Sequence, residues 1–239
     1  MDGNSMLWKG VKLGALLIHG FTATTVEVRQ LAEFFDKKGL TVSAPLLPGH
    51  GTNPHDLNKC KYLEWVDFVR NSYLELAGCC NSIIVAGESM GAVLALYMGI
   101  LYPEISCILL YSPALQVGNL RFARYVRFFK PFVQKTLTKD VLPWQGYTVW
   151  PLHAANELRK LQEKVRIDLK KINHPVLIFQ GKKDRTIDEE SGITIFEKVS
   201  SEKKKIIFLE QSGHVILLDH DLHEVKRLTW QFMVEQGIV

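Results

Sequence analysis

The stretch Ser82–Tyr102, SIIVAGESMGAVLALYMGILY, contains the turn that decides the fold. It opens with the apolar run IIVA at residues 83–86, which is typical of a strand buried on both faces. The pentapeptide GESMG at residues 87–91 follows, and a segment rich in Ala, Leu and Met then predicts a helix. A strand that turns into a helix within five residues holds its central residue, Ser89, in a strained conformation at the tip of the turn.

Glycines flank Ser89 at two positions on either side. A side chain at Gly87 or Gly91 would collide where the strand and the helix approach each other closely. The pattern Gly-x-Ser-x-Gly alone occurs by chance in roughly one chain in ten of this length. The strand before it and the helix after it make the signal specific. We therefore expect Ser89 to be a nucleophile held out at the tip of this turn.

Further strands and helices alternate along the chain. Apolar runs predict strands at 14–18, 40–47, 83–86, 107–111, 176–179 and 205–209. Apolar residues at helical spacing predict helices at 25–38, 62–76, 189–199 and 222–235, besides the helix after Ser89. Too few residues precede the first strand for a long antiparallel hairpin. The pattern predicts an α/β fold with a mainly parallel sheet of about six or seven strands and helices on both faces.

The alternation stops after residue 113. Residues 114–171 are too many for an ordinary loop, contain a helical pattern at 154–167, and follow a strand end, where active sites lie in such sheets. We divide the chain into a core domain, residues 1–113 and 172–239, and a helical lid, residues 114–171. The lid holds twelve Lys or Arg and four Asp or Glu, a net charge of +8, whereas the whole chain has +4.

The lid is rich in aromatic residues, many of them in the basic segment RFARYVRFFK at residues 121–130. Such a segment could bind nucleic acid, but it is also typical of a lid helix that covers an apolar pocket and keeps its cations in water. We favour the lid helix and expect no nucleic-acid partner; weak contact with an anionic lipid surface is a further alternative. Much of the aromatic surface is expected to face Ser89: Phe122, Tyr125, Phe128, Phe129, Phe132, Trp144, Tyr147 and Trp150.

Composition narrows the class of protein. Hydrophobic residues make up 47% and charged residues 23%, as in globular proteins. No apolar run approaches the ~20 residues that span a bilayer, and the first ten residues lack a signal-type pattern. Cys60, Cys79, Cys80 and Cys107 have no metal-type spacing. We expect free thiols, no metal site, no integral membrane span and a cytoplasmic location.

Two further residues complete a candidate catalytic triad. A serine hydroxyl needs a base to take its proton, and the base needs an acid to fix its tautomer. In this class of fold the chain order is Ser, acid, His, which Ser89, Asp184 and His214 obey. Asp184 follows one predicted strand and His214 follows the next. Asp188 is the alternative acid, although it precedes a helix and has the position of an N-cap.

Two aspartates after His214, Asp219 and Asp221, are interpreted as caps of the last helix. For the oxyanion of the reaction we expect two backbone N–H donors, those of Met90 after the nucleophile and Phe21 after the first strand. The alternative for Phe21 is an aromatic ring that only packs beneath its loop.

Several motifs together resemble the small bacterial carboxylesterases and their monoacylglycerol-lipase-like relatives among the α/β hydrolases. They are HGFTAT at 19–24, PGHG at 48–51, GESMG at 87–91, GKKD at 181–184 and EQSGHVILLD at 210–219. The similarity spans nearly the whole chain and is weakest in the lid. It implies ester hydrolysis through an acyl-enzyme, with no cofactor. The chain departs from the pattern at Ala92, where relatives often have glycine, and at Glu88, a carboxylate beside the nucleophile.

The sequence thus predicts a serine carboxylesterase for short- to medium-chain carboxylic esters, with monoacylglycerols among the candidates. A thioesterase or amidase using the same triad is the alternative within enzymes, and a non-catalytic ligand-binding protein on the same scaffold is the alternative outside them. The expected partner is a small-molecule ester, and the chain is expected to be a monomer or a homodimer.

Overall fold

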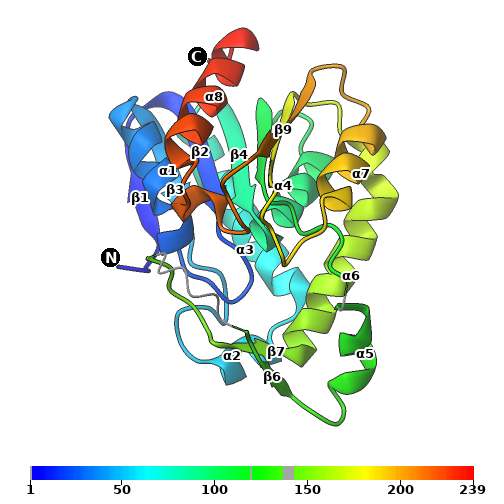
Figure 1. Cartoon of the computed structure of the whole chain (residues 1–239). Coiled ribbons are helices and arrows are strands. Elements are labelled where there is room, and N and C mark those ends of the chain that lie inside the picture. The colour runs from blue at the N-terminus through cyan, green and yellow to red at the C-terminus, as the bar shows by residue number, and fades with distance from the viewer. Residues whose placement is uncertain (1, 119, 137–142) are drawn as a thin grey trace.

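The computed structural model describes residues 2–118, 120–136 and 143–239. Seven strands of this part of the chain form one sheet in the order β1-β3-β2-β4-β5-β8-β9 (Figure 1). They are β1 (Met6–Trp8), β2 (Val11–Ile18), β3 (Leu40–Ala44), β4 (Ser82–Glu88), β5 (Cys107–Tyr111), β8 (Val176–Gly181) and β9 (Lys204–Leu209). Strand β1 is antiparallel to β3, and the other neighbours are parallel. The predicted mainly parallel sheet is confirmed.

Helices cover both faces of the sheet (Figure 1). One face packs against α1 (Val26–Lys37) and α8 (Leu222–Glu235). The other packs against α3 (Tyr62–Ala77), α4 (Met90–Leu101), α6 (Leu152–Asp168) and α7 (Glu190–Lys198). All of the helices that the periodicity predicted are present.

The central residues of strand β4 are all apolar because both faces of the strand are buried. Ile83 and Val85 belong to the hydrophobic cluster beneath α3 and α4, whereas Ile84 and Ala86 belong to the cluster beneath α1 and α8. Successive side chains of a strand point to opposite faces, so a strand covered on both sides must be apolar throughout. Burying both faces of this central strand fixes the place of the turn that follows it.

Two short elements were not predicted in the first third of the chain. Strand β1 has three residues and forms only through pairing with β3. Helix α2 (Pro54–Lys59) lies in the segment that we interpreted as a polar loop. The Asn53 side chain caps it by accepting from the N–H groups of His55 and Asp56, at 2.9 and 3.1 Å. Proline at the first helical position suits the same helix start.

The predicted lid contains more kinds of structure than the helix we expected. Its described elements are η1 (Leu120–Phe122), α5 (Ala123–Val126), β6 (Phe132–Gln134), β7 (Val149–Pro151), α6 and η2 (Leu169–Lys171). Residues 119 and 137–142 of the predicted lid lie outside the described residues. Strands β6 and β7 pair as an antiparallel ribbon that the sequence reasoning missed.

Within the lid, α6 contributes more buried side chains to the main core than any other described element. Leu158, Leu161 and Val165 are buried in the same cluster as α3 and α4. In contrast, α5, β6 and β7 lie at the far end of the molecule from the amino ends of the central strands (Figure 1). The division into core and lid stays a prediction, and α6 is the part of the lid most closely joined to the core.

All four cysteines are free thiols, in agreement with the sequence-based expectation. Within residues 2–118, 120–136 and 143–239, no helix has the length and apolar character needed to cross a membrane.

The two glycines of the Ser89 turn allow a helix and the sheet to approach closely. A Cβ atom on Gly91 would lie 2.0 Å from the carbonyl oxygen of Ile18 in β2, and one on Gly87 would lie 2.2 Å from backbone atoms of Gly91. Both positions therefore require glycine for reasons of space, as the sequence indicated.

We predict that Gly91→Ala lowers the free energy of unfolding by more than about 3 kcal/mol, because α4 must move away from β2. Gly78→Ala is the control. Gly78 ends α3 with a helical φ of −69°, and a Cβ there would meet its nearest atom at 3.4 Å. Urea unfolding curves measure both changes. Equal stabilities of the two variants would contradict the close approach at Gly91.

Candidate active site

Ser89 has the backbone conformation that a strand-to-helix turn demands. Its φ is +56° and its ψ is −115°, outside the regions favoured by residues with a side chain. The conformation is held by three backbone hydrogen bonds: the Ser89 N–H donates to Tyr111 at 2.9 Å, and the Ser89 carbonyl accepts from Ala92 and Ala114. The residue is 8% exposed, so its hydroxyl is reachable only from the cleft described below.

The structure brings Ser89, His214 and Asp184 together in one hydrogen-bonded chain. His214 Nε2 lies 2.9 Å from Ser89 Oγ, and His214 Nδ1 lies 2.8 Å from Asp184 Oδ2. The three residues follow β4, β9 and β8, whose carboxyl ends meet at the same edge of the sheet. Residues separated by more than a hundred positions are thereby placed in contact.

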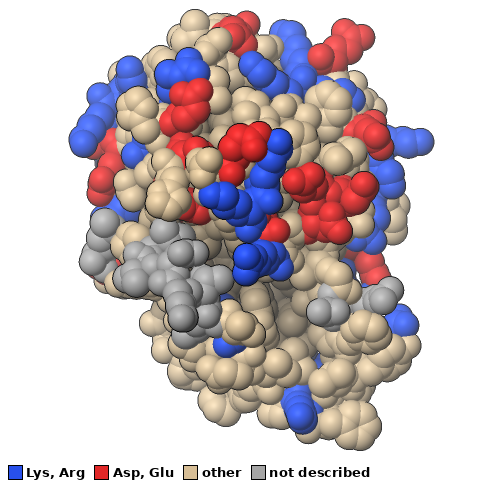
Figure 2. All heavy atoms as spheres, viewed as in Figure 1, with Lys and Arg blue, Asp and Glu red and all other residues tan. Residues whose placement is uncertain are grey.

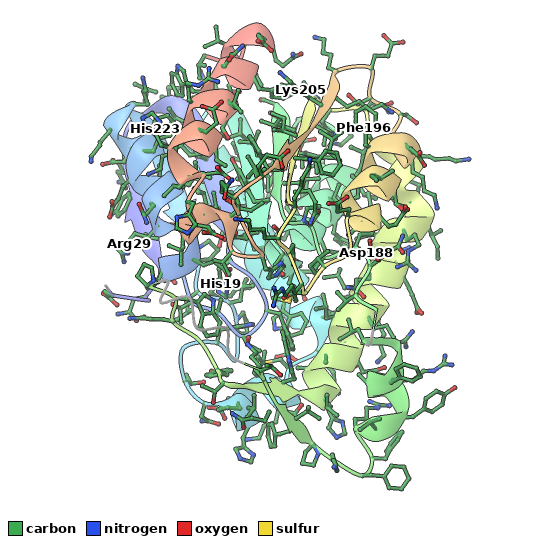
Figure 3. All side chains as sticks on the ribbon, in the orientation of Figure 1. His19, Arg29, Asp188, Phe196, Lys205 and His223 are labelled. Atoms are coloured by element: carbon green, nitrogen blue, oxygen red, sulfur yellow. The ribbon has the colours of Figure 1, made fainter. Side chains whose placement is uncertain are left out.

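The two candidate acids have different surroundings. The side chain of Asp184 is 1% exposed, and its Oδ1 accepts hydrogen bonds from the N–H groups of Thr186 and Ile187, at 2.8 and 2.9 Å. Asp188 is exposed and accepts from the Glu190 N–H at the start of α7 (Figure 3). Asp184 therefore faces the histidine. The N-cap position of α7 is Glu189 and not Asp188 as we expected, although the Asp188 side chain does accept from the first N–H of that helix.

The pKa shifts of His214 and Asp184 favour the transfer of a proton from Ser89 to His214. Burial alone would lower the pKa of His214, but the Asp184 carboxylate raises it above its ordinary value. Burial would raise the pKa of Asp184, but His214 and the two backbone N–H donors lower it. Asp184 is thus kept ionised, and it stabilises a positive charge on His214.

The loop that carries His214 is held by two aspartates. Asp219 Oδ2 accepts from the Gly213 N–H at 2.7 Å, and Asp221 Oδ2 accepts from the Gln211 N–H and the Ser212 hydroxyl, at 3.1 and 2.9 Å. We had interpreted both aspartates as caps of the last helix. That interpretation is wrong for their side chains, because Asp221 is at the N-cap position of α8 but makes no side-chain cap bond.

Glu88, the unusual neighbour of the nucleophile, points away from the cleft. It is fully buried, and its Oε1 accepts from the Leu217 N–H at 3.1 Å, just after the His214 loop. Burial raises the pKa of this carboxyl well above its ordinary range, and the charge of Glu27 adds to the effect. Glu88 therefore supports the short helix η3 (Ile216–Leu218) behind His214.

The loop after β2 lies on the other side of Ser89. A Cβ on Gly20 would come within 3.1 Å of the Ser89 Cβ, so this loop and the nucleophile are in direct contact. Phe21 lines the cleft, and its ring stacks on Trp150 with centroids 6.1 Å apart. Met90 is the first residue of α4, where a backbone N–H has no acceptor within the helix. Both sequence-predicted oxyanion residues thus flank Ser89.

A cleft of about 1000 Å³ opens above Ser89 and His214. Figure 2 shows the molecule hollowed near the middle of this face, with basic and acidic side chains gathered beside the hollow. The lining contains both apolar and charged side chains. The apolar side chains are Phe21, Ala114, Val117, Leu120, Trp150, Leu158, Ile187 and Val215, and the charged ones include Glu27, Lys135, Lys182, Lys183, Arg185 and Asp219.

The expectation that much of the lid's aromatic surface faces Ser89 holds for two tryptophans and is wrong for four of the other rings. Trp144 and Trp150 do line the cleft. Four others point to the surface instead, with exposed fractions of 47% for Phe122, 57% for Tyr125, 70% for Phe128 and 87% for Phe129. The reason is that α5 has only four residues, too few to align these rings along one face above the cleft.

Two cleft residues were missed by the sequence reasoning. Glu27 is an acidic residue in the first turn of α1, where such residues are common for the helix dipole alone. Lys135 is one of twelve basic residues in the lid, and its burial lowers its pKa to about 8. Neither has a sequence signal that separates it from a surface residue.

The described residues contain no group of three or more His, Cys, Asp or Glu side chains that could hold a metal ion.

Comparison with known proteins agrees with this geometry. Residues 15–228 match the family described as the alpha/beta hydrolase family. The chain is 33% identical over 230 residues to a thermostable monoacylglycerol lipase of Bacillus sp. (strain H-257), which covers 94% of this chain and 92% of the relative. It is 29% identical over 232 residues to a carboxylesterase of Bacillus subtilis (strain 168), with 95% and 94% covered.

Among solved structures, one from work on LipS and LipT, two metagenome-derived lipolytic enzymes, superposes with a TM-score of 0.92 at 25% identity, over 98% of both chains. The Paleococcus ferrophilus monoacylglycerol lipase, at 18% identity, shares the fold with a TM-score of 0.81 over 99% of this chain and 100% of the other. The protein described here belongs to the alpha/beta hydrolase family.

Proposed function

We propose that the protein is a serine carboxylesterase that hydrolyses short- to medium-chain carboxylic esters, monoacylglycerols among them. The observation that carries the proposal is the hydrogen-bonded chain from Asp184 through His214 to Ser89, placed at the floor of a cleft. Relatives named as a monoacylglycerol lipase and a carboxylesterase support the same reaction class.

In the proposed reaction His214 Nε2 takes the proton of Ser89 as its Oγ attacks the ester carbonyl carbon. The carbonyl π electrons move to the oxygen, where the N–H groups of Phe21 and Met90 stabilise the negative charge. When the tetrahedral intermediate collapses, the bond to the alcohol oxygen breaks and His214 returns its proton to that oxygen. Water then attacks the acyl-enzyme by the same steps and releases the carboxylic acid.

The shape of the cleft supports an ester with an aliphatic acyl chain. Its apolar lining includes Val117 and Leu120 from the lid and Leu158 from α6, in the same cleft as Ser89. Each methylene that leaves water for such a surface contributes about 0.8 kcal/mol. Catalytic efficiency is therefore expected to rise with acyl length until the apolar lining is filled.

The first test is Ser89→Ala, assayed over a series of p-nitrophenyl esters of increasing acyl length. We expect the variant to fold as the wild type and to lose kcat by roughly 10⁴-fold or more at every length, because the nucleophile is absent. A fluorophosphonate probe should label the wild type at Ser89 and leave the variant unlabelled. Retention of a tenth of the wild-type rate in Ser89→Ala would refute the proposed mechanism.

The same assay distinguishes the two candidate acids. Asp184→Asn keeps the shape but presents the wrong tautomer of His214, whereas Asp188→Asn changes a side chain outside the triad and keeps an oxygen that can accept from the Glu190 N–H. The matched pair should differ in kcat by about 10³-fold or more.

The second test is the pH dependence of kcat/KM. His214 must be neutral to accept the serine proton, and its pKa is raised above the ordinary 6.5 by Asp184. Activity should therefore be full at alkaline pH and fall as pH drops through a midpoint above 6.5. In Asp184→Asn, where the carboxylate no longer stabilises the imidazolium, the remaining activity should persist to lower pH. A midpoint that stays unchanged in Asp184→Asn would mean that another group controls the profile.

We further propose that the exposed lid aromatics contact an anionic lipid surface. Tyr125, Phe128 and Phe129 project into solvent together with the partly exposed Val126 and Val133. Residues 114–136 contain five Lys or Arg and no Asp or Glu. Apolar side chains that enter a bilayer interface, with cations beside them for anionic headgroups, match this composition. A second copy of the chain is the other occupant that such an apolar surface would fit.

The third test is sedimentation with vesicles made of equal parts phosphatidylcholine and phosphatidylglycerol. We expect the wild type to bind and the double variant Phe128→Ser/Phe129→Ser to stay in solution. The control is Ile167→Ser, which removes an equally exposed apolar side chain, 76% exposed, from α6. Equal binding of the double variant and the wild type would contradict the lipid contact. A dimer in ultracentrifugation that the double variant loses would assign the surface to a second copy.

A further inference from the structure

Glu27 is a buried acidic residue that borders the cleft and has no role in the proton transfers above. It lies in the first turn of α1 and is 4% exposed, yet it lines the cleft together with Ser89 and Gly20. Placing a carboxylate there is costly, because burial raises its pKa and disfavours its charge. A group retained at such a cost needs hydrogen-bond donors, and the structure supplies two.

Each carboxylate oxygen of Glu27 accepts a hydrogen bond from a different part of the chain. Oε2 accepts from the Gly20 N–H at 2.5 Å, in the loop that carries Phe21. Oε1 accepts from Trp144 Nε1 at 3.3 Å, in the lid. A Cβ on Gly20 would come within 2.8 Å of Glu27 Oε2 and within 3.1 Å of Ser89 Cβ. The carboxylate and the nucleophile thus both lie against Gly20.

The lid segment 143–148 also runs along the same loop. Gly146 forms an antiparallel bridge with Ala23, and the Tyr147 N–H donates to the Thr22 carbonyl at 2.9 Å. Thr22 has a φ of +67°, which a residue with a branched side chain adopts only when its surroundings impose it. The loop beside the nucleophile therefore depends on the lid for part of its shape.

Lys135 adds a cation to this arrangement. Its ammonium group donates to the Thr22 hydroxyl and lies over the rings of Trp144 and Trp150, 4.7 and 4.2 Å from their centroids. Its charge and that of Glu27 attract each other across the cleft wall, as the influence of each on the other's pKa indicates. Three groups of the lid, the Trp144 indole, the Tyr147 amide and the Lys135 ammonium, thus converge on Glu27 and Thr22.

We propose that Glu27 is a positioning residue that joins the lid to the oxyanion loop, with one carboxylate oxygen for each. By holding Gly20 it sets the direction of the next peptide, which carries the Phe21 N–H toward the developing oxyanion. By holding Trp144 it keeps the lid in the position in which the lid supports Thr22. This role rests on the proposed esterase function and adds to it a dependence of catalysis on the lid.

The test is Glu27→Gln, which keeps the size of the side chain but replaces one acceptor oxygen by an NH₂ donor. One of the two N–H partners must then face another donor and is left without a bond. Because the oxyanion is present only in the transition state, kcat should fall by about 10- to 100-fold with KM within about threefold. The control is Glu157→Gln on α6, an equally buried glutamate, 3% exposed, that pairs with Lys160.

A second readout is the pH profile, which a merely structural change would not move. His214 faces Asp184, Glu27 and Lys135, and the charge of Glu27 helps to raise its pKa. Glu27→Gln should therefore shift the acid limb of kcat/KM to lower pH, and Glu157→Gln should leave the limb in place. A kcat for Glu27→Gln within twofold of the wild type, with the limb unmoved, would overturn the proposal.

Trp144→Phe tests the lid half of the link and keeps the proposal falsifiable if the Glu27 variant does not fold. It removes one N–H and retains an aromatic ring, and kcat should fall by about 3- to 10-fold. In the Glu27→Gln background it should cause a smaller loss than in the wild type, because the glutamine has one acceptor oxygen for the two N–H donors and removal of Trp144 Nε1 leaves that oxygen to the Gly20 N–H. Trp230→Phe on α8 is the control.

Two outcomes would refute the link between Glu27 and Trp144. In one, the losses of kcat in Glu27→Gln and Trp144→Phe multiply in the double variant; in the other, kcat of Trp144→Phe equals that of Trp230→Phe. Both outcomes differ from failure of the esterase function itself. In that case the wild type would neither hydrolyse the ester series nor react with the fluorophosphonate.

Discussion

The contact between Gly91 and the carbonyl of Ile18 is the constraint on which the site depends. It lets α4 begin directly against β2, so that the chain turns from β4 into α4 within a few residues and leaves Ser89 at a φ of +56°. The same contact brings the end of β2, and with it Gly20, against the nucleophile. One glycine thus sets the distance between the two backbone segments from which the oxyanion donors come.

The other half of the site depends on carboxylates that position loops. Asp219 and Asp221 bind backbone and hydroxyl donors in the His214 loop, and Glu88 binds the Leu217 N–H behind it. A histidine on an unsupported loop would sample many orientations, and its hydrogen bond to Ser89 would form only part of the time. Several acceptors on one short loop remove that freedom before the substrate arrives.

Local patterns in the sequence were enough to predict the central strands and the helices, because these depend on neighbouring residues in the chain. The triad of Ser89, Asp184 and His214 could be predicted because the order of the parallel strands brings their carboxyl ends to one edge of the sheet. Strand β1 and the β6–β7 ribbon could not be predicted, since each has only three residues and forms through pairing alone. Glu27 could not be recognised either, because an acid in the first turn of a helix needs no other explanation.

Three carboxyl groups near His214 show how surroundings assign different tasks to similar side chains. Asp184 accepts from two backbone N–H groups and from His214, so its pKa is lowered and it carries the charge. Burial raises the pKa of Glu27 and of Glu88, where fewer donors oppose it. Asp184 is the carboxylate that contacts the imidazole, whereas Glu27 and Glu88 accept from backbone N–H groups and hold the Gly20 loop and the segment behind His214 in place. The hydrogen-bond partners of each carboxyl group therefore separate Asp184, which contacts His214 directly, from Glu27 and Glu88, which position the backbone around it.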